Sequence, residues 1–234
     1  MDEEYLKEIH SAAADYWLTV EPDKKERLYH LVKAGRIRDA CKLLINDKYE
    51  FLDSMNKDIR DIVDEIEGFP EKYSVDVLEM KIAAALEFGD HDSAKEAAER
   101  LAAVDKEKGT LFIADVELSR GNTNNAMAVL GSGEDSSDRA GWALRMAGCL
   151  AAAARYDEAK ELLESTKDEI NRTGDLSCLN DVYLLLSTVL IRMGLPDDAI
   201  KQLNKAMSSA GKRDRDRISI KLSEAHLSKV DCIH

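Results

Sequence analysis

The segment YHLVKAGRIRDACKLL, from Tyr29 to Leu44, decides how this chain folds. It reads as two short helical patterns, with Gly35 five residues before Ala40. The first helix ends in the small residue and a tight polar turn follows. The alanine lets the second helix lie close against the first, because a bulky side chain there would separate the two. The segment therefore predicts an antiparallel pair of helices.

The same spacing of a small residue and an alanine recurs four more times along the chain. The intervals between successive copies are 54, 32, 33 and 40 residues, so the three central copies repeat with a period near 33. Self-similarity at such a period is typical of a solenoid. The pairs that we expect to pack the repeats are Gly35 and Ala40, Gly89 and Ala94, Gly121 and Ala126, Ala154 and Ala159, and Gly194 and Ala199.

The composition favours an all-α protein. Of the 234 residues, 44% are apolar, only three are proline and twelve are glycine. The β-branched and aromatic clusters that mark strands are nearly missing. Together with the repeat, this predicts a right-handed α-solenoid of antiparallel helix pairs with 12 or 13 helices. We expect them near residues 3–19, 24–34, 36–46, 54–67, 74–88, 91–104, 108–119, 122–131, 137–153, 156–171, 176–193, 196–210 and 213–230.

The sequence also predicts three regions. The stretch EGFPEKYS, from Glu67 to Ser74, is the best internal boundary. We expect an N-terminal helical subdomain with one divergent repeat at residues 1–70, regular repeats at residues 71–210, and a C-terminal capping helix and tail at residues 211–234. In the capping helix, Ile218, Leu222 and Ala225 are expected to face inward and polar residues outward.

The repeats resemble the tetratricopeptide repeat family. The likeness is clearest in AGCLAAAARYDEAKELLE, from Ala147 to Glu164, and in LLLSTVLIRMGLPDDAIKQLNKAM, from Leu184 to Met207. It covers roughly residues 75 to 210 and a divergent copy at 21 to 52. The resemblance implies stacked helix pairs whose first helices line a concave groove that receives a peptide or a helix.

A second resemblance concerns IHSAAADYWLTVEPDKKERLYHLVKAGRIRDACKLL, from Ile9 to Leu44. This stretch is similar to the segment that follows the winged helix in archaeal signal-transduction ATPases of the maltose-regulator type, which carry a helical-repeat sensor arm after the ATPase module. The chain has no GxxxxGK[ST] motif, and GSGEDSSD, from Gly131 to Asp138, lacks the lysine. The resemblance therefore implies the arm without the ATPase.

The charge narrows the class of partner. The chain has 33 Lys and Arg against 46 Asp and Glu, a net charge of −13 that repels nucleic acid and anionic lipid. Only residues 211–230 are basic, with six bases against three acids. No apolar run is long enough to span a bilayer, and the acidic N-terminus is unlike a signal peptide, so we expect a cytoplasmic protein with buried, reduced cysteines.

No motif indicates catalysis or a metal site. Asp58, Asp61 and Asp64 have a spacing that can hold Mg²⁺, but Ile59, Ile62, Val63 and Ile66 form an apolar stripe that puts these aspartates on the solvated face of one helix. The five histidines form no Glu-x-x-His pattern, and Cys232 and His234 make at most half a zinc site. We expect no cofactor, no metal and no enzymatic activity.

What remains is the surface of the expected groove. Aligning the repeats on their alanines places six residues on or near it, with a mixed lining of charges. The first hypothesis is a protein interaction module or scaffold that binds a peptide or helix there. The alternative is a regulatory or ligand-sensing arm related to signal-transduction ATPases, and the partner and oligomeric state stay open. The six groove residues are Lys33, Glu79, Asp115, Arg145, Tyr183 and Arg192.

Overall fold

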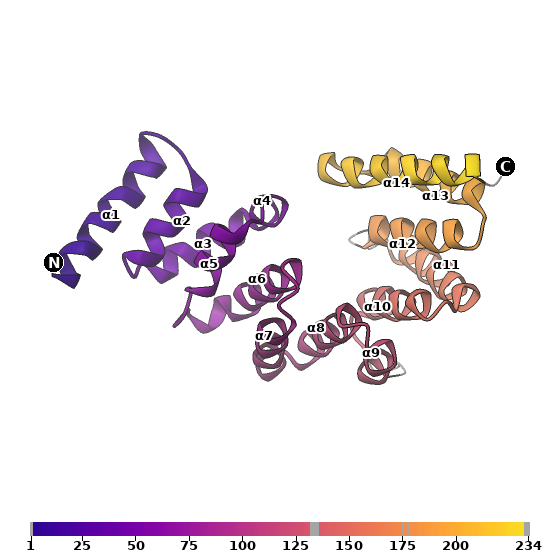
Figure 1. Cartoon of the computed structure of the whole chain (residues 1–234), viewed down its shortest axis with the longest axis horizontal. Helices are drawn as coiled ribbons and strands as arrows, with labels where there is room; N and C mark the ends of the chain where they lie inside the picture. The colour runs from indigo at the N-terminus through magenta and orange to yellow at the C-terminus, as the bar shows by residue number, and fades with distance from the viewer. Residues whose placement is uncertain (1, 132–135, 175, 177, 232–234) are drawn as a thin grey trace. The chain divides into compact units, whose positions relative to one another are not determined.

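The chain is helical throughout the part that the structure describes. The computed structural model describes residues 2–131, 136–174, 176 and 178–231, and these form fourteen α-helices, one short 3-10 helix and no strand (Figure 1). The all-helical repeat fold predicted from the sequence is confirmed. The helices are α1 (Glu3–Thr19), α2 (Lys24–Lys33), α3 (Ile37–Asn46), α4 (Lys48–Asp53), α5 (Lys57–Asp64), the 3-10 helix η1 (Glu71–Tyr73), α6 (Ser74–Glu87), α7 (His91–Val104), α8 (Lys106–Ser119), α9 (Thr123–Leu130), α10 (Arg139–Ala152), α11 (Tyr156–Thr173), α12 (Leu179–Arg192), α13 (Pro196–Ser209) and α14 (Lys212–Asp231).

These helices fold into two compact units, residues 1–120 and residues 121–234. Within the first unit, α1 packs on α2, α6 on α7 and α7 on α8. Within the second unit, each helix from α10 to α14 packs on the next, and α10, α12 and α14 also contact one another in that order. The subdivision after residues 70 and 210 falls inside these units and stays a prediction.

The turns between paired helices share one backbone geometry. The Gly35 N–H donates to the Val32 carbonyl and the Arg36 N–H to the Leu31 carbonyl, both at 2.9 Å, which is the pattern of a Schellman turn. This turn needs a left-handed residue, a conformation that costs glycine little. The φ angles are +72° at Gly35, +68° at Gly89, +81° at Gly121, +58° at Ala154 and +75° at Gly194.

The alanine of each pair lies at the close approach of two helices. Its N–H donates to the carbonyl of the residue after the small one, as from Ala40 to Arg36 at 3.0 Å and from Ala199 to Leu195 at 3.2 Å. The turn thus begins the second helix four residues before the alanine. Five alanines, Ala40, Ala94, Ala126, Ala159 and Ala199, have no solvent exposure.

One region differs from the helices expected. The helix expected over 54–67 is shorter, since α5 covers Lys57–Asp64, and a further helix, α4, covers Lys48–Asp53, where no helix is expected. The side chain of Asn56 accepts a hydrogen bond from the Ile59 N–H at 3.0 Å and so begins α5 after the predicted start. The additional helix α4 is held by Phe51, which is buried among residues of α2, α3 and α5.

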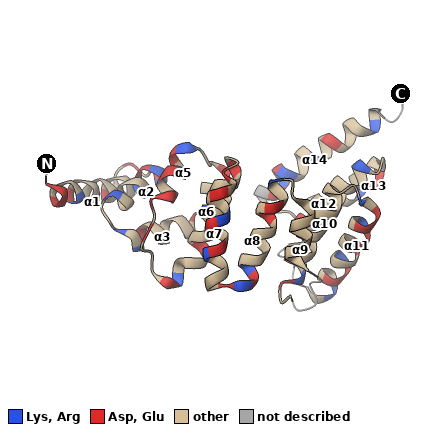
Figure 2. Cartoon of the chain, turned by 60° about the horizontal axis from the view of Figure 1, so that its bottom comes forward, with Lys and Arg blue, Asp and Glu red and all other residues tan. Residues whose placement is uncertain are grey.

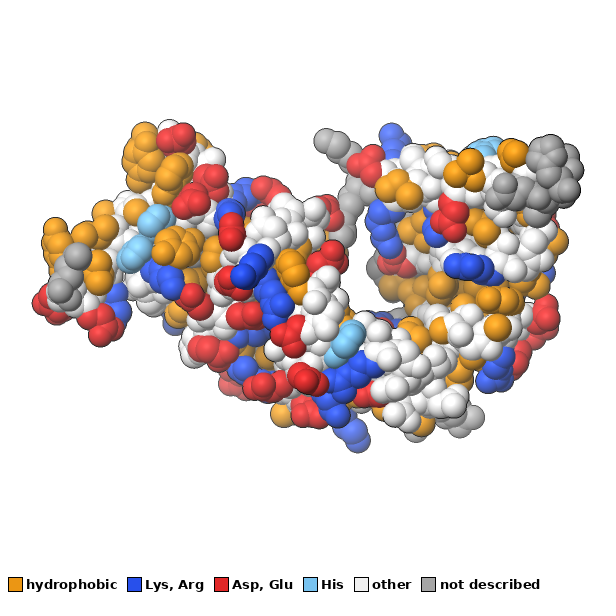
Figure 3. All heavy atoms as spheres, viewed as in Figure 1, with side chains coloured by type: hydrophobic (Ala, Val, Ile, Leu, Met, Phe, Trp, Pro, Cys, Tyr) orange, Lys and Arg blue, Asp and Glu red, His pale blue; other side chains and the backbone are white. Residues whose placement is uncertain are grey.

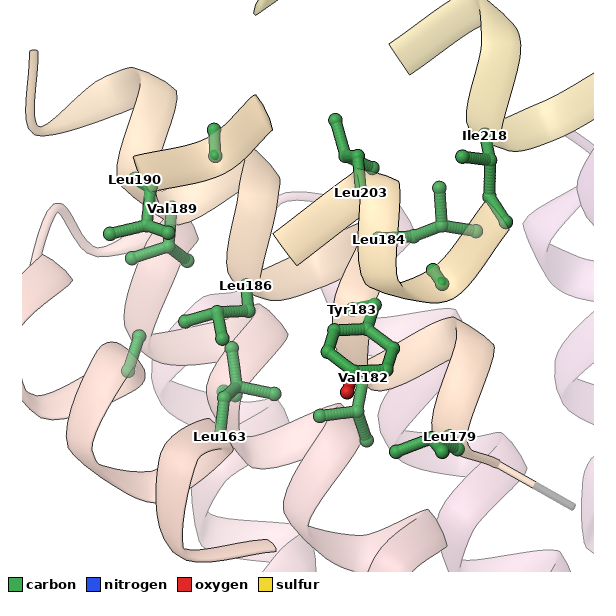
Figure 4. Packing of buried hydrophobic residues seen from close by; sticks show 14 of the residues in the cluster. Leu163, Leu179, Val182, Tyr183, Leu184, Leu186, Val189, Leu190, Leu203 and Ile218 are labelled. Atoms are coloured by element: carbon green, nitrogen blue, oxygen red, sulfur yellow. The ribbon is translucent and has the colours of Figure 1, made fainter. Parts of the chain in front are cut away.

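The two units differ in how their cores are built. In the second unit one continuous apolar cluster runs from α10 to α14, and Figure 4 shows Leu186 of α12 beside Leu163 of α11. In the first unit the buried residues form separate clusters that meet on α6. Val77 and Met80 belong to the cluster of α2, α3 and α5, whereas Leu78 belongs to the cluster with α7.

Candidate protein-interaction surface

The six predicted groove residues are divided between the units. Lys33, Glu79 and Asp115 lie in the first unit, and Arg145, Tyr183 and Arg192 lie in the second.

In the first unit, the predicted groove residues are engaged within the fold. The Lys33 ammonium pairs with Glu65 at 2.6 Å and lies 5.6 Å from the ring centre of Tyr29. The hydrogen bond to Glu65 raises the pKa of Lys33, and partial burial opposes this. Asp115 is half-buried on α8 and also interacts with another group of the chain.

Glu79 joins three helices of the first unit. Its side chain is 14% exposed and accepts hydrogen bonds from Lys48 of α4 at 2.5 Å and from Lys108 of α8 at 2.9 Å. Burial acts to raise the pKa of Glu79, but the two lysine hydrogen bonds outweigh it and the pKa is lowered. This carboxylate therefore has a structural role in linking α4, α6 and α8.

In the second unit, only one of the three predicted residues lines a described groove. Tyr183 is buried in the core, and burial followed by the charge of Asp168 raises its pKa. Arg145 is half-buried and donates to the Gly141 carbonyl at 3.2 Å on its own helix. Arg192, at the end of α12, is exposed and has no ion-pair partner among the described residues.

Arg192 lies in a groove between α12 and α14. The groove has a volume of about 650 Å³ and is open to solvent. Ile220 and Leu227 are 71% and 68% exposed, although both are large apolar side chains. The α12–α14 groove is lined by Ile191, Arg192, Ile220, Ser223, Glu224, Leu227 and Ser228.

The spacing of residues along α14 places these side chains in the groove. Positions 220, 224 and 227 are separated by four and three residues and so share one helix face. Ile218 and Ala225 lie on another face and are fully buried against the second unit. The expectation that α14 is polar on its outer side is wrong, because Ile220, Leu227 and Val230 are exposed there. Their spacing of seven and three residues is the signal that could have identified them.

The lining of the groove contains one basic residue, Arg192, and one acidic residue, Glu224. Glu224 is paired with Lys221 at 2.6 Å, whereas the charge of Arg192 is not matched by a neighbour among the described residues. The three helices that contact one another along this side, α10, α12 and α14, contain nine basic and five acidic residues. In contrast, α11 and α13 contain five basic and eight acidic residues, and α11 carries many of the acids in red in Figure 2.

Apolar side chains accompany this charge. On the face of the second unit seen in Figure 3, orange side chains gather over α10, α12 and α14. Ile191 of α12 lines the groove and is half-buried, because it also packs on the core. The surface can therefore bury apolar groups of a partner while Arg192 receives a carboxylate.

The candidate metal ligands on α5, Asp58, Asp61 and Asp64, do not form a metal-binding cluster. Asp58 pairs with Lys25 at 2.6 Å and Asp64 with Arg60 at 3.4 Å. No three His, Cys, Asp or Glu side chains in the described residues are placed to hold a metal ion. Cys232 and His234 lie outside those residues. Cys41 and Cys149 are buried, Cys178 is half-buried, and none of these three forms a disulfide.

Two of the histidines form an unexpected pair. The Nδ1 atoms of His10 on α1 and His30 on α2 lie 2.7 Å apart, and the edge of the Tyr29 ring approaches His10. Burial, and then the charge of His10, lowers the pKa of His30, while Glu26 opposes the shift. The pair contributes to the contact between α1 and α2.

None of the described helices is long and apolar enough to cross a membrane.

Comparison with known proteins adds information on the fold. No protein-family model matches the chain, and a search of curated proteins finds no match. Among solved structures, the chain is similar to a tetratricopeptide repeat protein from Parabacteroides merdae, with a TM-score of 0.58 and 13% identity over 94% of this chain and 91% of that one. The chain thus has a tetratricopeptide-repeat-like fold.

Proposed function

We propose that this chain is a non-enzymatic scaffold whose second unit binds an acidic, amphipathic segment of a partner protein in the α12–α14 groove. The observation that carries the proposal is Arg192, an exposed guanidinium without a partner among the described residues, beside exposed Ile220 and Leu227. A helix laid in such a groove buries its apolar stripe against the two aliphatic side chains. A carboxylate on the edge of that helix then pairs with Arg192.

The open form of the groove supports an interaction scaffold over a ligand-sensing arm. A small-molecule sensor requires a pocket that encloses most of its ligand. The α12–α14 groove is open to solvent and has the form that a peptide or helix requires. We therefore place the sensor arm second, and the expected cytoplasmic location stays a prediction.

A display selection tests the proposal. A library of helical peptides is selected on the wild-type protein and, in parallel, on a groove variant that carries Arg192→Glu and Ile220→Ser. Both positions are exposed, so the variant is expected to keep its helical circular dichroism. We expect the enriched peptides to combine apolar residues three or four apart with Asp or Glu, and to lose at least about tenfold in affinity for the variant.

A matched control reverses a charge outside the groove. Lys205→Glu on α13 makes the same type of charge change as Arg192→Glu at another exposed position of the second unit. Peptides that bind the groove should bind this control as they bind wild type. Equal binding to wild type and to the groove variant would exclude the groove as the binding site.

A further inference from the structure

Helix α1 has an apolar face that the fold leaves exposed. Ala14 is fully buried against the first unit, and α1 packs on α2. Tyr5, Ile9 and Tyr16 lie on another face, at intervals of four and seven residues, and are 55%, 45% and 44% exposed. Three large apolar side chains in one stripe on a surface helix are typical of a contact with another protein.

Acidic side chains border this stripe. Glu4 and Glu8 directly precede Tyr5 and Ile9 and are one helical turn apart. Glu3 is paired with Lys7 at 2.8 Å and Asp15 with Arg36 at 2.8 Å, whereas Glu8 has no ion-pair partner among the described residues. The outer face of α1 therefore combines an apolar stripe with a free carboxylate.

These are the properties that the α12–α14 groove requires of its occupant. We propose that α1 of a second copy of this chain docks in the groove, with Tyr5 and Ile9 against Ile220 and Leu227 and with Glu8 beside Arg192. The inference rests on the proposed function, because it assigns an occupant to the same groove. The two surfaces are complementary in charge: α1 bears an unpaired acid, the groove bears an unpaired base, and each lies next to an exposed apolar stripe.

The two surfaces differ, so the contact is head-to-tail. A copy whose groove is occupied still has an unoccupied α1. The copy that supplied its α1 still has an unoccupied groove. Association therefore continues beyond two copies or closes into a ring. This property separates the contact from one in which two copies use identical surfaces.

A complementation experiment uses this difference. The α1 variant Ile9→Lys puts a positive charge in the stripe, and the groove variant Ile220→Ser removes an apolar side chain from the groove without adding a charge that could pair with that lysine. Both positions are exposed, so we expect helical content and melting temperature to stay as in wild type. The mass is measured by sedimentation over a range of concentrations.

We expect the wild-type mass to rise with concentration above the 26.1 kDa of one chain. Each variant alone should associate at least about tenfold more weakly. An equal mixture should form a species of twice the chain mass and nothing larger, because the α1 variant supplies an intact groove and the groove variant supplies an intact α1. The control Val104→Lys, at an exposed apolar residue elsewhere in the first unit, should associate as wild type does.

Three outcomes would overturn the inference. If the wild-type protein keeps the mass of a single chain at all concentrations, α1 does not bind a second copy. A variant that still associates alone as wild type does means that its altered surface is not part of the contact. A mixture that forms no dimer means that the two surfaces do not meet.

The display selection distinguishes a failure of the inference from a failure of the proposed function. If selected peptides bind the groove while the chain does not self-associate, the groove is an interaction site for another protein and only the inference fails. If no peptide depends on the groove, the proposed function fails as well. Peptides that bind the groove should also dissociate the wild-type oligomer by competition.

Discussion

The two units of this chain differ in the balance of polar and apolar interactions that join neighbouring repeats. The first unit contains 29 acidic and 18 basic residues and the second 17 and 15. In the first unit, ion pairs link helices about one repeat apart, as from Lys33 to Glu65, 32 residues on, and from Lys48 to Glu79, 31 residues on. In the second unit, a continuous apolar cluster runs through α10 to α14, and ion pairs such as Lys229 to Asp197, 32 residues apart, add to it.

The comparison shows that one turn geometry supports two kinds of repeat interface. Both units use the left-handed turn and the buried alanine, so helix pairing is common to them. What differs is the layer between pairs, which is polar around Glu79 and apolar around Leu186. The two units should therefore respond differently to core truncation, charge removal and pH. Trp17 lies in the first unit and Trp142 in the second, so fluorescence of single-tryptophan variants can follow each unit separately.

The largest effect is expected from truncating the core of the second unit. Leu203 of α13 is fully buried in the continuous cluster. Leu203→Ala should lower the unfolding free energy of the second unit by about 2–5 kcal/mol, because a cavity replaces the lost contacts. Urea unfolding followed by Trp142 measures this change. A similar loss reported by Trp17 would contradict the separation of the two cores.

Removing the charge of Glu79 should be the next largest effect, and it should act on the first unit. Glu79→Gln leaves Lys48 and Lys108 without their carboxylate and should cost about 1–3 kcal/mol, as for a partly buried charged hydrogen bond. Because the pKa of Glu79 is lowered in the folded chain, its contribution is present above its ordinary value of 4.5 and is lost as the pH falls through the folded pKa. Unfolding followed by Trp17 at pH 7 and pH 3 checks this: the difference between the variant and wild type should be smaller at pH 3 than at pH 7.

The shared turn should give effects of opposite sign in the two units. Ala154 in the second unit adopts a left-handed backbone without being glycine, so Ala154→Gly should stabilise that unit by about 1 kcal/mol. Gly89→Ala in the first unit should destabilise by about the same amount, because a Cβ there meets no atom within 4 Å and only the backbone conformation opposes it. Thermal unfolding of the two variants gives the signs. A stabilised Gly89→Ala variant would show that the turn geometry does not limit stability.

The smallest effect is expected from the histidine pair between α1 and α2. The unfolded chain takes up a proton at His30 near pH 6.5, whereas the folded pKa of His30 is lower. Stability of the first unit should therefore fall as the pH drops below 6.5 towards the folded pKa. His30→Gln should remove this part of the pH dependence, and Trp17 on α1 reports it. A profile that is the same in wild type and variant would show that His30 does not contribute.

Some features of this fold were readable from local patterns. The small residue and alanine five positions apart predict the turn and the pairing, because the turn needs a left-handed residue and the close helix contact needs a small side chain. The start of α5 is also local, since the capping asparagine Asn56 is a sequence signal that places the start after residue 54, where the prediction put it. These features depend on neighbours within a few residues.

The candidate site was less accessible to such reasoning. Glu79 was expected in the groove, but the lysines that bind it lie 31 and 29 residues away, and no local pattern brings them together. Arg192 was identified from its place in the repeat. The apolar half of its groove was missed, because the exposure of Ile220 and Leu227 depends on which face of α14 the second unit covers.

The sequence by itself determined most of the helices, the turns and the period of the repeat, because these follow from backbone conformation and side-chain size over short distances. The tertiary structure decided which charges are neutralised and which apolar stripes stay exposed. Burial and ion pairing depend on groups that the fold brings from a repeat away, and so Glu79 became part of the framework while Arg192 remained available at the surface.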